Sequence, residues 1–118
     1  MKYMLLVYLA EDSMDEAARE HCYEESARLC QDLAASGHFL AAAPLHPVSP
    51  ATSVRVRDGK PVVTDGPFAE TREQLGGFYL IDAKNLDEAI HIAARIPPAS
   101  VGTIEIRPVM EIPGLPTG

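Results

Sequence analysis

The sequence predicts a single α+β domain in which one antiparallel sheet carries both helices on the same face. Three observations predict this class. Strand-like and helical segments alternate along the chain, a β-branched hairpin separates its two halves, and the first strand-like segment is apolar on both sides. A length of 118 residues fits one domain. We expect that domain to cover residues 1–112, followed by an irregular Pro-rich tail over residues 113–118.

The first half of the chain predicts a strand, a long helix and a second strand. Residues 3–9 alternate apolar side chains on both faces, so both faces of this strand need a cover. Ser13 with Glu16 matches a capping box, and the helix that it begins ends at about Ser36, before Gly37. The apolar stripe of this helix is predicted to be Ala18, Cys22, Leu29 and Leu33, with Ser26 on the same line. Residues 39–43 predict the second strand.

The second half predicts a hairpin, a strand, a helix and a last strand. The hairpin arms flank Asp58-Gly59, a two-residue loop that suits a type I′ turn. Residues 77–82 form an aromatic-rich strand. Asn85 and Glu88 predict the start of a helix that Pro97-Pro98 terminates. The stripe of this helix is predicted to be Leu86, Ala89, Ile90 and Ala93, and residues 103–110 predict the last strand.

The order β-α-β, hairpin, β-α-β predicts a ferredoxin-like split βαβ fold with an inserted β-hairpin. Two helices on one face leave the other face of the antiparallel sheet bare. The strand at residues 3–9 is nevertheless apolar on both sides. We therefore expect a homodimer whose two sheets face each other.

Composition excludes several classes of function. A net charge of −7 without any Lys/Arg-rich block disfavours nucleic acid and anionic membranes as partners. The apolar run near the N-terminus is too short for a membrane span and lacks a cleavage site. Cys22 and Cys30 share the first helix about 12 Å apart, so they cannot form a disulfide. We expect free thiols in a reducing cytoplasm.

No cofactor or metal is expected from the motifs present. The four histidines, at positions 21, 38, 46 and 91, form no H-x-x-x-H pair, and no cysteine joins them at a metal-ligand spacing. The chain also lacks G-x-S-x-G, Walker and C-x-x-C motifs. The two consecutive glycines Gly76-Gly77 have neither the spacing nor the following helix of a phosphate loop.

Candidate site residues come from three places, and each has a purely structural alternative. Glu105 and Arg107 point to the bare sheet face, as an anion-binding pair or as an exposed ion pair. His21 precedes Glu25 by one helical turn, which orients a catalytic histidine or only a surface one. The segment after the hairpin offers a ligand-binding wall or a rigid turn with solvated charges, through Asp65, Phe68, Glu70, Arg72 and Glu73.

The segment "TDGPFAETREQLGGFYLIDA" resembles the signature of the DGPF (DGPFAETKE) proteins, a branch of the YCII-related family. The resemblance extends to "NLDEAIHIAARIP" and "GTIEIRPVMEIPG" and covers most of residues 51–114. It implies a dimeric α+β barrel with Asp65, Gly66, Pro67, Phe68, Glu70 and Glu73 in the characteristic site region. Arg72 stands where the usual motif has Lys, which excludes a role for a deprotonated lysine.

The resemblance also bears on activity and partners. The wider barrel superfamily includes muconolactone isomerase-like enzymes and a chloromuconolactone dehalogenase. YCII-like relatives carry a His in the first helix, which His21 matches. Some members are genomic neighbours of alternative sigma factors, which implies a sigma factor as a partner.

Three hypotheses follow. The first is a cofactor-free isomerase or lyase acting on a small anionic organic molecule, with His21 and Asp65 as catalytic residues. Its substrate-binding residues would be Phe68, Glu70, Arg72, Glu105 and Arg107. The second is a non-catalytic ligand-binding or regulatory module linked to a sigma factor. The third is a structural dimer in which residues 65–73 only fix the hairpin.

Overall fold

The protein's structure is a computed structural model that describes residues 1–116. Its elements are β1 (Lys2–Leu9), α1 (Glu16–Ala35), β2 (Phe39–Pro44), β3 (Thr52–Arg57), β4 (Lys60–Asp65), β5 (Gln74–Asp82), α2 (Leu86–Ala94), a 3-10 helix (Pro97–Ser100) and β6 (Thr103–Pro108). Four strands form an antiparallel sheet in the order β2-β5-β1-β6, and β3 pairs with β4 in a separate two-stranded sheet. This order is that of the ferredoxin-like fold, so the predicted α+β class is confirmed.

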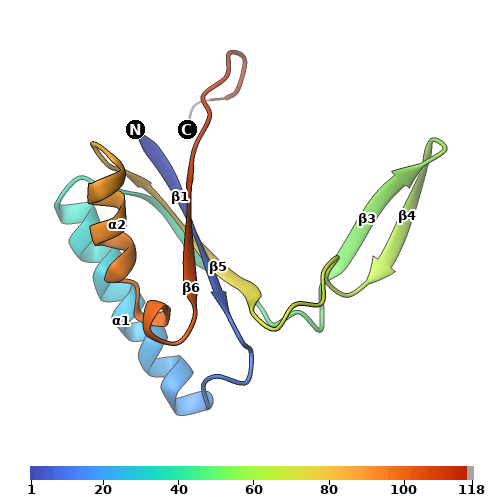
Figure 1. Ribbon diagram of the computed structural model, residues 1–118, viewed down its shortest axis with the longest axis horizontal. Coiled ribbons are helices and arrows are strands. Elements are labelled where there is room, and N and C mark those ends of the chain that lie inside the picture. The colour runs from blue at the N-terminus through green and yellow to red at the C-terminus, as the bar shows by residue number, and fades with distance from the viewer. Residues whose placement is uncertain (117–118) are drawn as a thin grey trace.

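Both helices cover one face of the sheet (Figure 1). On this side β1 buries Tyr3, Leu5 and Val7, which pack with residues of α1, α2 and β5 in the hydrophobic core. β1 is apolar on both faces because it lies in the centre of the sheet and its alternate side chains point to opposite faces. Tyr3, Leu5 and Val7 are almost completely buried, and removal of their apolar surface from water stabilises the fold.

The opposite face of the sheet, which we call the open face, has no helix on it (Figure 1). Met4, Leu6, Phe78 and Leu80 lie on this face, and all four are half-buried. The register places Glu105 beside Leu6 and Arg107 beside Met4, so the edge strand β6 adds charge to the open face. The predicted direction of these two side chains is confirmed.

Helix α1 begins later than the sequence indicates. Its N-cap is Asp15, whose side-chain oxygen Oδ1 accepts the backbone N–H of Ala18 at 2.8 Å. The expectation that Ser13 caps the helix is wrong, because the Ser13 N–H closes a preceding turn onto the Ala10 carbonyl at 3.0 Å. The end is as predicted, since Gly37 follows the C-cap with a φ of 81°.

Helix α2 begins at the predicted cap, where Asn85 accepts the backbone N–H of Glu88 at 3.0 Å. Its buried side chains are Ala89, Ile92 and Ala93. Leu86 and Ile90 are exposed, so half of the predicted stripe is wrong. The helix is short enough that several apolar faces fit its sequence, and the packing onto β6 and the 3-10 helix selects one of them.

The predicted hairpin is confirmed at its turn and both strands. Asp58 and Gly59 both have positive φ, 52° and 75°, as a type I′ turn requires. We call residues 52–65 the arm. Figure 1 shows the arm standing away from the rest of the chain, on the side of the sheet opposite the helices.

Among the described residues, no helix or strand follows β6. Strand β6 stops at Pro108, two residues before the predicted end. Residues 113–116 of the expected tail are exposed, and residues 117–118 lie outside the described residues. Within residues 1–116, no helix is long and apolar enough to cross a membrane.

Candidate functional site

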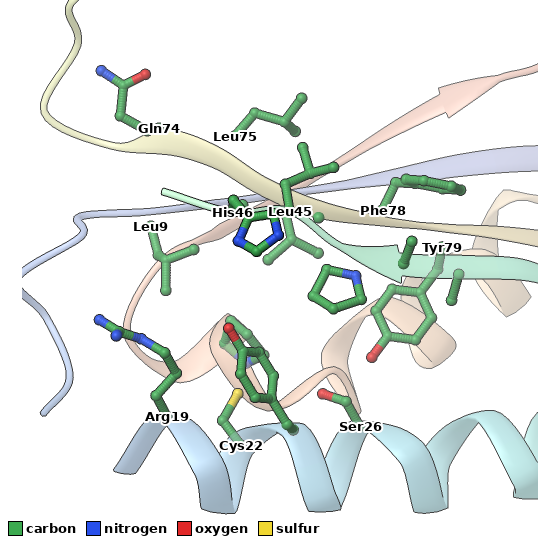
Figure 2. Close-up of a pocket in the computed structure, with 18 of the residues that line it drawn as sticks. Leu9, Arg19, Cys22, Ser26, Leu45, His46, Gln74, Leu75, Phe78 and Tyr79 are labelled. Carbon is green, nitrogen blue, oxygen red and sulfur yellow. The ribbon is translucent and has the colours of Figure 1, made fainter. Parts of the chain in front are cut away.

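A cavity of about 560 Å³ lies between α1 and the sheet. Its walls come from α1, the ends of β1, β2 and β5, and the loop after β2. Figure 2 shows Arg19, Cys22 and Ser26 rising from α1 toward Tyr79, His46 and Leu45 on the sheet side. The volume suits a small organic molecule, for which pockets of about 300–1,000 Å³ are usual. Apolar side chains dominate the lining, so a ligand's hydrocarbon part would be buried there.

Small residues leave the space that the cavity occupies. β2 contributes Ala42 and Ala43 to the wall, and α1 contributes Ser26, Ala27 and Cys30. Gly77 of β5 brings β2 close, because a Cβ there would lie 2.9 Å from the Ala43 carbonyl oxygen. At these positions the side chains of α1 and β2 are too small to fill the space between the helix and the sheet.

The polar groups on the inner wall are uncharged at neutral pH. Burial raises the pKa of the Tyr79 hydroxyl, and interaction with Ser26 only partly opposes this effect. Burial also raises the pKa of the Cys22 and Cys30 thiols. Tyr79 is thus a hydrogen-bond donor, and neither cysteine is held as a reactive thiolate.

The charged residues of the cavity wall lie beside the β1–α1 connection. Arg19 lies in the first turns of α1, and its guanidinium Nη2 donates to the backbone carbonyl of Glu11 at 3.4 Å. The Glu11 carboxylate accepts the backbone N–H of Val48 at 2.7 Å, which ties this connection to the loop after β2. His46 lies in that same loop and also lines the cavity. Arg19, Glu11 and the exposed His46 therefore border an apolar cavity.

His21 and Asp65, predicted as catalytic residues, lie outside this cavity and far apart in the fold. His21 is exposed on α1, its ring nitrogen Nε2 contacts the Glu25 carboxylate, and it borders a separate shallow hollow with Pro97 and Val101. Asp65 is exposed at the end of β4, in the arm. The structure does not bring these two residues together, and their catalytic roles stay predictions.

The five predicted substrate-binding residues lie outside the same cavity. Phe68, Glu70 and Arg72 follow the arm and are exposed, with Phe68 81% accessible. Glu105 and Arg107 form a 3.3 Å ion pair on the open face. Glu73 accepts the Thr103 hydroxyl at 2.9 Å and so ties this segment to β6. Ligand binding by the five residues stays a prediction.

Comparison with known proteins identifies the chain's relatives. The YCII-related domain matches residues 1–113. The chain belongs to the YCII-related family. An uncharacterised protein of Rhizobium meliloti is 39% identical over an alignment 118 positions long, and the match covers 92% of this chain and 92% of that protein. The predicted resemblance is thereby confirmed at the level of the family.

A solved structure shares the fold of this YCII-related chain. It is 5-chloro-2-hydroxyhydroquinone dehydrochlorinase from Burkholderia phenoliruptrix in complex with 2,5-dihydroxybenzoquinone. The TM-score is 0.58 with 13% identity, over 93% of this chain and 94% of that one. At this identity the likeness establishes the fold alone.

Sequence reasoning missed the residues that line the cavity of this YCII-related protein. The sequence pattern predicted Cys22 and Ser26 on the apolar stripe of α1 and Cys30 only as a free thiol of the same helix. It indicated His46 only as one of four histidines that lack a metal-ligand spacing. The signal that could have found them is the run Ala41-Ala42-Ala43 opposite small residues on α1. Within residues 1–116, no three His, Cys, Asp or Glu side chains group as a metal site would require.

Proposed function

We propose that this YCII-related protein is a cofactor-free isomerase or lyase that binds a small organic anion in the cavity between α1 and the sheet. The observation that carries the proposal is the apolar cavity bordered by Arg19, His46 and the protonated Tyr79. The fold neighbour supports it, since it is a dehydrochlorinase solved with a small dihydroxyquinone.

Each of the three residues has a role that follows from its chemistry. Arg19 binds the anionic group of the substrate through charge-assisted hydrogen bonds. His46 removes a proton from a carbon next to a carbonyl, and the electron pair of the C–H bond moves into an enolate. Tyr79 donates a hydrogen bond to the developing oxyanion. An isomerase then returns the proton to another carbon, whereas a lyase expels a leaving anion.

The binding step is tested with a panel of small aromatic carboxylates, lactone carboxylates and 2,5-dihydroxybenzoquinone. Isothermal titration with Arg19→Gln should give affinity at least about tenfold lower than with the unmodified protein. Arg28→Gln is the matched control, because Arg28 is exposed on the same helix and does not line the cavity. Equal affinity for both variants contradicts an anion site at Arg19.

The chemical step is tested by exchange in D₂O. The protein should catalyse incorporation of deuterium at the acidic carbon of a compound that binds, as followed by NMR. His46→Asn should remove this exchange while the compound still binds, and His91→Asn, an exposed histidine of α2, should leave it intact. Exchange that persists in His46→Asn contradicts the assigned base. Exchange lost only on changing Asp65 or Arg107 would move the reaction to those residues.

The alternative is a ligand-binding module without catalysis, linked to a sigma factor. One observation favours it, namely that the inner hydroxyl and thiols all have raised pKa values and so transfer protons poorly at neutral pH. Tight binding without any deuterium exchange would decide for this alternative. If a pull-down then captures a sigma factor only when the compound is bound, the sigma factor is the partner that the module regulates.

A further inference from the structure

The arm has one apolar face and one basic face. In its register Val54 lies opposite Val63, and Val56 lies opposite Pro61, so these four share a face. Arg55, Arg57 and Lys60 lie on the other face, together with Val62. This alternation of apolar and polar residues is the pattern of a strand pair with one buried side.

The apolar face of the arm has no cover within the described residues of its own chain. Val54, Val56 and Val63 are 61%, 62% and 63% accessible. Over residues 1–116, β3 and β4 pair with each other and with no strand of the main sheet. An isolated two-stranded hairpin is at best marginally stable in water. The arm therefore needs a second surface to pack against.

The position of the arm indicates where that surface comes from. The arm projects on the side of the sheet that carries the open face (Figure 1). Met4, Leu6, Phe78 and Leu80 on that face are only half-buried. Any molecule that packs on the open face therefore lies next to the arm as well, so one partner can cover both apolar surfaces.

Charge favours a second copy of this chain as the partner on this side. The exposed face of α1 carries Glu16, Glu20 and Glu24 in one line, so two copies would repel each other there. The open face instead carries the Glu105–Arg107 ion pair, which has no net charge. Around a two-fold axis, Glu105 of one copy can meet Arg107 of the other, which makes the face self-complementary.

We propose that the arm of each copy reaches across a second copy packed on its open face and lays its valine face on that copy. The face-to-face packing is the dimer expected above, and the new element is that the arm extends the interface beyond the sheet. The basic face, with Arg55, Arg57 and Lys60, stays in solvent. This inference does not depend on the proposed function.

The test compares two valine positions on one face of the arm with a valine on the other. Val54→Thr with Val63→Thr keeps the β-branched shape and removes apolar contact, whereas Val62→Thr makes the same change on the basic face. In sedimentation velocity the double variant should weaken the dimer at least about tenfold. The single variant should stay within about twofold of the unmodified protein. A monomeric unmodified protein, or equal effects of both variants, overturns the proposal.

A second measurement tests the proposal even if the double variant folds poorly. A photo-crosslinking phenylalanine derivative replaces Val56 at the centre of the apolar face, in otherwise unmodified protein. Equal amounts of ¹⁵N-labelled and unlabelled chain are mixed, irradiated and digested. Crosslinked peptides that join a labelled to an unlabelled chain support the proposal. Crosslinks only within one chain, or no crosslinks, overturn it.

Discussion

Glu88 connects the start of α2 with the turn between α1 and β2. Its carboxylate accepts the backbone N–H of Lys84 at 3.0 Å and contacts His38 Nε2 at 3.1 Å. The Lys84 N–H, and secondarily His38, hold the pKa of this carboxyl below its usual 4.5, although burial opposes them. A lowered carboxyl pKa stabilises the folded state above the unfolded-state pKa, and this stability is lost as the pH falls through the folded-state pKa.

Glu88→Gln should therefore destabilise the protein at neutral pH and much less in acid. Urea unfolding of both proteins, at neutral pH and well below pH 4.5, measures this difference. The gap in the free energy of unfolding should narrow as the pH falls. Glu70→Gln is the control, because Glu70 is exposed. A gap that stays constant with pH would show that the charge of Glu88 contributes nothing.

At the residue scale, the sequence predicted where charged side chains lie, but it did not predict the cavity. The sequence identified Glu105 and Arg107, and even the sheet face on which they lie. It could not show that Arg19 and His46 border one cavity, because they approach through the packing of α1 and the loop after β2. A cavity depends on what neighbouring side chains fail to fill, and no single residue type signals that.

At the element scale, the first turn of α1 offers a direct comparison of two possible caps. Asp15→Ala should lower the free energy of unfolding by about 1 kcal/mol, because the Ala18 N–H loses its acceptor. Ser13→Ala should leave stability nearly unchanged. Urea unfolding of both variants measures this. A larger loss from Ser13→Ala would show that the helix begins where the sequence first indicated.

The elements were predictable where local chemistry alone decides them. Asp58-Gly59 permits a tight turn, and Gly37 permits a left-handed residue, whatever the rest of the chain does. The start of α1 and the stripe of α2 were not decided locally. Ser13 and Asp15 both satisfy capping rules, and only the turn from Ala10 to Ser13 excludes the first. Ile92 replaced Ile90 in the core because of how α2 packs.

At the scale of the whole molecule, the arm and the body should differ in stability. Hydrogen exchange at low protein concentration, where copies separate, should show fast exchange of the arm amides and slow exchange of those in β1 and β5. At high concentration the arm amides should become protected while the body changes little. Protection of the arm that is equally strong at all concentrations would contradict its dependence on a second copy.

The order of strands in the sheet followed from the order of elements along the chain, because β-α-β, hairpin, β-α-β predicts the split βαβ arrangement. The direction of the arm did not follow, since it depends on the short segments that join it to β2 and β5. No periodicity in residues 52–65 specifies on which side of the sheet they project.

The place where the arm joins the body has a consequence for the redesign of this protein. β2 and β5 are already neighbours, paired as far as Pro44 and Gly77, and Leu45 N–H donates to the Gly76 carbonyl at 2.9 Å. The chain thus leaves and re-enters the sheet at adjacent points. Residues 46–73 could be exchanged for a short turn, or for another module, without any change in strand order, since closing such a short gap costs little entropy. One local deletion at this junction would therefore separate the arm from the four-stranded sheet.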